Sequence, residues 1–171
     1  MKRLAVLMMS LSLLTGCASL PGEERAFAVC LGVHHDGDVW QVTARVPSYR
    51  QDSGYLTLTG QGASLAEAMA AADASSPMRL HLGQLRLLTF TRETAEDADF
   101  PGVLEALSRW PDMRLRAIMT VTAASLTDLM NALSPRTGTR LSKDIETLMA
   151  SRVEQGVAIS ATLADWMRAG E

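Results

Sequence analysis

The order in which strand-like and helical periodicities alternate constrains this chain more than any other feature. Residues 39–46 alternate apolar and polar side chains, which is typical of a strand with one buried face. Residues 65–72 instead repeat apolar side chains at helical spacing, and Ser64 with Glu67 predicts a capping box at their start. Further strands are predicted within 26–33, 54–60, 79–91 and 114–122, and further helices near 100–110, 126–133, 142–153 and 160–168.

This order predicts an α/β protein of the α+β type, with a mixed, mostly antiparallel sheet of about five strands and helices packed on it. Residues 34–38 form a polar hairpin turn in which Gly37 supplies the permissive backbone. The chain thus opens with a meander, which excludes a doubly wound parallel fold. Within 39–46 we expect Thr43 and Arg45 to face outward. The apolar parity changes after Gly83, so a bulge or bend is expected there.

The first 17 residues carry an export and lipidation signal. Lys2 and Arg3 precede an apolar stretch over 4–14, which is too short to cross a membrane as a helix. The sequence Leu-Thr-Gly-Cys at 14–17 matches the lipoprotein box, in which small residues admit the signal peptidase and the thiol of Cys17 takes diacylglycerol as a thioether. Two acyl chains hold a protein more firmly than one. The sequence therefore predicts a signal peptide over 1–16, a lipidated tether over 17–25 and a single domain over 26–171.

Charge and cysteine content narrow the classes of function. The chain has 16 basic and 19 acidic residues, and loss of Lys2 and Arg3 with the signal leaves 14 basic ones. A weakly acidic surface argues against nucleic-acid binding and against electrostatic attachment to anionic lipid. Membrane attachment is therefore expected to be covalent, through Cys17. The second cysteine, Cys30, lies in an apolar run and is expected to be a small buried side chain.

Groups that could carry out chemistry are few, and each has a structural explanation. His34 and His35 would point to opposite faces of a strand and chelate a metal poorly, so a solvated turn is expected. Gly60 and Gly62 precede a helix and could cradle an anion, but the dinucleotide fingerprint is incomplete and a structural turn is favoured. Solvation and capping account for the acidic residues within 93–99. We therefore predict no catalytic, metal or cofactor site and no enzymatic activity.

Several stretches together resemble a known family. They are the residues Gly-Gln-Gly-Ala-Ser-Leu-Ala-Glu-Ala at 60–68, Arg-Leu-His-Leu-Gly-Gln-Leu-Arg-Leu-Leu-Thr-Phe at 79–90 and Pro-Asp-Met-Arg-Leu-Arg-Ala at 111–117, which runs on into Thr-Val-Thr-Ala at 120–123. With the lipobox and the early apolar strand, their order resembles the N-terminal domain of the Ger(x)C family, the lipoprotein C subunits of bacterial spore germination receptors. Gln84 stands where the family usually has histidine, and family members continue into further domains.

The resemblance implies a lipid-anchored, non-enzymatic subunit of a nutrient germinant receptor on the outer face of the cytoplasmic membrane, which in a spore is the inner membrane. Its implied partners are a polytopic A-type subunit and a transporter-like B-type subunit. Confinement by the acyl chains would raise its effective concentration near such partners. The alternative is a generic envelope lipoprotein that binds a ligand or helps assemble an envelope structure. An envelope hydrolase would need a convergent acid, base and nucleophile, and the sequence offers no such set.

Overall fold

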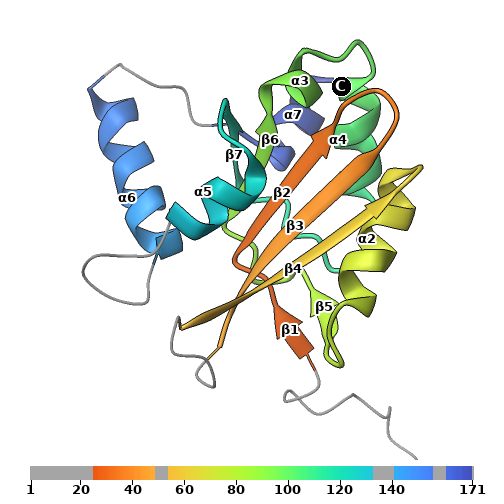
Figure 1. Cartoon of the computed structure of the whole chain (residues 1–171). Coiled ribbons are helices and arrows are strands. Elements are labelled where there is room, and N and C mark those ends of the chain that lie inside the picture. The colour runs from red at the N-terminus through yellow and green to blue at the C-terminus, as the bar shows by residue number, and fades with distance from the viewer. Residues whose placement is uncertain (1–24, 49–53, 133–140, 156–160, 171) are drawn as a thin grey trace, which may run out of the picture.

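A six-stranded mixed sheet forms the centre of the protein (Figure 1). The computed structural model describes residues 25–48, 54–132, 141–155 and 161–170. Three of the five strand pairings in this sheet are antiparallel, and the pairings of β2 with β6 and of β6 with β7 are parallel. In spatial order the strands are β4 (Tyr55–Gly62), β3 (Trp40–Pro47), β2 (Cys30–His35), β6 (Leu87–Thr91), β7 (Ile118–Thr122) and β8 (Ala161–Thr162).

A second, two-stranded sheet pairs β1 (Arg25–Phe27) with β5 (Arg79–His81) in parallel. This small sheet explains why two apolar runs of the sequence are each divided into two strands. The apolar run at 26–33 leaves β1 at Ala28, whose N–H donates to the His81 carbonyl, and enters the large sheet as β2. The run at 79–91 leaves β5 and turns where Leu85 N donates to Leu82 O, before it continues as β6. The bend expected after Gly83 is thus confirmed, and each apolar run contributes to both sheets.

Helices cover both faces of the large sheet. The described helices are α2 (Leu65–Ala74), α3 (Arg92–Glu96), α4 (Phe100–Ser108), α5 (Leu126–Ala132), α6 (Leu141–Glu154) and α7 (Leu163–Ala169). The main core joins alternate residues of the central strands, among them Leu31, Val42 and Phe90, to α2, α4 and α7 on one face. On the other face α5 packs through Met130 against Cys30. The predicted α+β class and mixed sheet are therefore confirmed.

The face beneath α5 differs from the sequence-based expectation. Thr43 and Arg45, predicted to face solvent, are 0 % and 4 % exposed. They are buried because α5 lies over them: Arg45 Nη1 donates to the Met130 carbonyl at 2.5 Å, and the guanidinium lies 3.6 Å from the centre of the Tyr55 ring. The prediction that β3 is half-buried was wrong. Polar residues on one face of a strand indicate solvent exposure when the strand is considered alone, but here that face is covered by a helix whose Met130 lies 85 positions later in the chain.

Gly60 and Gly62 lie within β4 and not in a turn before α2. Their role is close packing, because a Cβ at Gly60 would lie 2.1 Å from Ala72 N and 2.2 Å from Ala68 O. These are backbone atoms of α2, and they cannot shift unless the whole helix moves. The missing side chains therefore let α2 lie directly on the edge strand.

Substitution Gly60→Ala is expected to lower the free energy of unfolding by at least about 2 kcal/mol, because a methyl group is forced into the backbone of a packed helix. Urea unfolding of the two proteins measures the difference. Gly170→Ala is the matched control, since a Cβ there would come no closer than 3.8 Å to any atom beyond its neighbours. Equal stability of the two variants would contradict the packing argument.

Candidate functional site

The carboxyl ends of three neighbouring parallel strands meet at one edge of the large sheet. β2 ends at His35, β6 at Thr91 and β7 at Thr122, and each is paired with the next. In open sheets with parallel strands, ligands bind in the crevice outside this edge. The edge is therefore the first place in this fold at which to look for a site.

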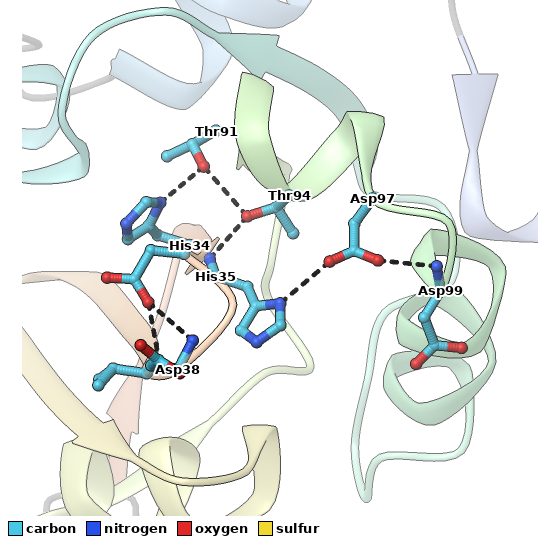
Figure 2. Close-up of polar contacts among 9 residues, drawn as sticks. His34, His35, Asp38, Thr91, Thr94, Asp97 and Asp99 are labelled. Carbon is cyan, nitrogen blue, oxygen red and sulfur yellow. Dashed lines mark hydrogen bonds and ion pairs between the residues drawn. The ribbon is translucent and has the colours of Figure 1, made fainter.

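A hydrogen-bonded network joins the end of β2 to α3 at this edge (Figure 2). The backbone N–H of His35 donates to Thr94 Oγ1 at 2.7 Å, and Thr94 Oγ1 lies 3.0 Å from Thr91 Oγ1. His34 Nδ1 is 2.8 Å from the same Thr91 oxygen. Both threonines are buried. Two neighbouring hydroxyl groups thus hold a strand end, an imidazole ring and a short helix in one arrangement.

His35 lies on the other face of β2 from His34. Its ring stacks on Trp40 with centroids 4.1 Å apart, and its Nδ1 is 3.2 Å from Asp97 Oδ2. The other carboxylate oxygen of Asp97 accepts from the Asp99 N–H at 2.9 Å. The hydrogen bond from Asp99, and then that from His35, hold the pKa of Asp97 below its ordinary value. Asp97 therefore links the end of β2 to the start of α4.

The two histidines were expected in a solvated turn, and that prediction was wrong. They form the last two residues of β2 and are half-buried, while the exposed turn is residues 36–39, with Gly37 at φ +98°. The difference arises because the antiparallel pairing of β2 with β3 continues through His34 and His35, which lie opposite Gln41 and Trp40. The rings point to opposite faces, as expected for neighbours in a strand. Helix α3, which overlaps the acidic stretch 93–99, was not predicted.

A cavity of about 260 Å³ opens at the same edge, between the end of β2 and the start of α5. Among the described residues that line it, Glu93 is the one carboxylate, and none is lysine or arginine. Hydrogen bonds from its own backbone N–H and from the Thr91 hydroxyl hold the pKa of Glu93 below its ordinary value. Polar side chains in the lining are His34, Gln41, Thr91, Glu93, Ser125 and Thr127.

The floor of this region is a polar stretch of sheet beneath α5. Gly32 is paired with Thr43 on one side and Thr89 on the other, so the three form one row across the sheet. Leu126 fills the space above Gly32, where an added Cβ would lie 2.7 Å from Leu126 Cδ2. The hydroxyl oxygens of Thr43 and Thr89 are buried, and neither has a hydrogen-bond partner among the described residues. Leu126 also lines the cavity, so one side chain contacts both regions.

The structure tests the prediction for one of the two cysteines. Cys17, the predicted lipidation site, lies outside the described residues. Cys30 is fully buried, as predicted, and burial raises its pKa to about 12 although Arg45 opposes the shift. Its thiol is therefore protonated at neutral pH and unreactive.

Metal ligands and membrane spans can be assessed for the described part of the chain. There, no group of three or more His, Cys, Asp or Glu side chains is placed to hold a metal ion. Within the same residues, no helix combines the length and the apolar character that crossing a bilayer requires.

Comparison with known proteins gives one match. The family model described as "Spore germination protein N-terminal domain" matches residues 21–169, which is most of the chain and includes every described element. No curated protein and no solved structure matches the chain. The family resemblance noted from the motifs is thereby confirmed.

Substitution Thr94→Val tests the network at the strand end. Valine keeps the shape of the side chain but leaves the His35 N–H without its acceptor, so we expect a loss of about 1–3 kcal/mol in the free energy of unfolding. Thr59→Val is the control, because Thr59 is exposed in β4 and its change is expected to stay within about 0.5 kcal/mol. Indistinguishable urea midpoints for the two variants would show that the network adds no stability.

Asp97 should make stability depend on pH. A carboxyl whose pKa is lower in the folded state stabilises the fold above its unfolded pKa of about 3.9, and the contribution is lost as pH falls through the folded pKa. Asp97→Asn is therefore expected to destabilise the protein more at pH 7 than at pH 3 in urea unfolding. The exposed Asp38→Asn serves as control. A loss for Asp97→Asn that is equal at both pH values would contradict the assignment.

Proposed function

We propose that this chain, which belongs to the family of spore germination protein N-terminal domains, is a lipid-anchored, non-enzymatic subunit of a germination receptor complex. The observation that carries the proposal is the family match over residues 21–169, which places the chain in the context of germination. The proposal adds cleavage before Cys17, lipid on that cysteine, and membership of a membrane complex. It also takes residues 17–25 as tether and 26–171 as one domain.

The lipoprotein box supports the anchor, and the fold supports an orientation. The described chain begins at Arg25 in β1, at the lower end of the molecule in Figure 1, while the carboxyl end of β2 lies at the upper end. The six residues of β2 span about 20 Å between these ends. Lipid on Cys17, joined to β1 by a short tether, would hold the β1 end toward the membrane and leave the carboxyl edge facing away.

In this proposal the subunit works as a scaffold or binding module at the membrane surface. Acyl chains restrict the domain to the membrane surface, which raises its concentration near other membrane proteins and lets a weak interface be occupied. The partners we propose are the polytopic A-type and transporter-like B-type subunits, on the outer face of the cytoplasmic membrane or spore inner membrane. The family match favours this germination role over the alternative of a generic envelope lipoprotein.

Crosslinking in spore membranes tests the proposal. Cys17→Ala is expected to remove the chain from the membrane fraction and to lower its crosslinking to the A-type and B-type subunits at least tenfold, because the effective concentration is lost. Cys30→Ala is the matched control, since it removes the buried thiol and keeps the lipoprotein box.

The two parts of the proposal fail separately. A native chain that never crosslinks to either subunit would exclude membership of the complex. Membrane retention and crosslinking of Cys17→Ala equal to those of the native chain would exclude the lipid anchor. Loss in both cysteine variants would point to misfolding and would also count against an anchor specific to Cys17.

A further inference from the structure

We propose that the cavity at the carboxyl edge of β2, β6 and β7 binds a small organic cation, a protonated amine on a short apolar carbon skeleton. The proposal goes beyond the receptor role and does not depend on the lipid anchor. It rests on the position and size of the cavity, the arrangement of its polar groups and its apolar wall.

Position and size favour a small molecule. The cavity lies outside the carboxyl ends of parallel strands, where ligands of open sheets bind. Its volume of about 260 Å³ is just below the range typical of pockets for drug-sized molecules. A ligand with a short skeleton therefore fits, and a nucleotide or a folded peptide does not.

The charge of the lining selects a cation. Glu93 provides a carboxylate, and no described lysine or arginine lines the cavity, although the charge of the neighbouring Arg92 is one of the smaller causes that lower the pKa of Glu93. A carboxylate accepts hydrogen bonds and donates none, so it suits an ammonium group and repels an anion.

The hydrogen-bonded network fixes the directions of the protons around Glu93. Thr94 Oγ1 accepts from the His35 N–H, so its own proton can be donated to Thr91 Oγ1, 3.0 Å away. His34 Nδ1–H can donate to the same oxygen at 2.8 Å, and the Thr91 proton then goes to the Glu93 carboxylate. In this arrangement the hydroxyl groups of Thr91 and Thr94 both donate and accept, and His34 Nε2 is left as an acceptor.

Three acceptors are then available to an ammonium group, which has three N–H donors. They are the Glu93 carboxylate, His34 Nε2 and the side-chain carbonyl of Gln41, all from residues in the lining. The network that holds His34 and Glu93 is buried at Thr91 and Thr94. These two acceptors are thus positioned before a ligand arrives, which lowers the entropy cost of binding.

The opposite wall accepts carbon atoms. Ala123, Ala124 and Leu126 line the cavity where β7 leads into α5. Leu126 is 3 % exposed and occupies the space left by Gly32, so its position is fixed from below. A short apolar skeleton attached to the amine would lie against these side chains.

Three probes with one carbon skeleton and different head groups separate charge from shape: butylammonium, 1-butanol and butyrate. The full chain, labelled with 15N and held in a neutral detergent, is titrated with each probe, and amide shifts are followed by NMR. We expect saturable shifts at residues 123–127 and around His34 with butylammonium, and at least tenfold weaker binding of the other two. Shifts that are equal for all three probes, or absent from these residues, would overturn the proposal.

Three variants test whether Glu93 provides the negative charge that binds the cation. Glu93→Gln keeps the shape of the exposed side chain and is expected to weaken butylammonium binding at least tenfold. Glu105→Gln, on the surface of α4, makes the same change in net charge and is expected to leave binding unchanged. Ala124→Leu should fill the cavity and abolish the shifts while the rest of the spectrum is retained. Undiminished binding by Glu93→Gln, or an equal loss in Glu105→Gln, would contradict a site built on Glu93.

Discussion

The parallel pairing of β2 with β6 is the interaction on which the rest of the structure depends. Residues Cys30 to Val33 lie beside Leu87 to Phe90, more than 50 positions later in the chain. Parallel neighbours cannot be joined by a tight turn, so the intervening chain must cross back over the sheet. That crossing places α2 on one face, and the next parallel step from β6 to β7 adds α3 and α4. The same two pairings bring the strand ends together and so create the edge where the network and the cavity lie.

The face of the sheet that carries Thr43 and Arg45 is polar, yet it is covered by α5. The contacts that hold α5 in place are therefore partly polar. A buried guanidinium is costly unless its donors are satisfied. Arg45 donates to the carbonyl of Met130 in the last turn of α5 and lies against the ring of Tyr55. At its other end α5 is held by Leu126 over Gly32. One polar contact and one apolar contact thus fix the helix whose first residues form a wall of the cavity.

The sequence predicted local elements better than it predicted what covers them. The strand at 39–46 and the helix begun by Ser64 follow from periodicity and capping within a few residues, and both are present. Burial of Thr43 and Arg45 was missed because it depends on a helix that approaches from far along the chain. For the same reason, the sequence indicated only some of the residues of the candidate site. His34 and His35 stood out, but their partners Thr91 and Thr94 lie 57 and 59 residues away. Thr91 is a threonine at the end of an apolar run and Thr94 lies in the charged segment after it, so neither is conspicuous in the sequence.

The proposed membrane anchor lies at one end of the domain, and the proposed cation-binding edge lies at the other. Paramagnetic relaxation of the lipidated chain in nanodiscs that carry nitroxide-labelled headgroups tests this arrangement most directly. Amide signals of β1 and β5 should broaden most, and those of residues 123–127 least. Strongest broadening at residues 123–127, or no broadening anywhere in the domain, would contradict the account.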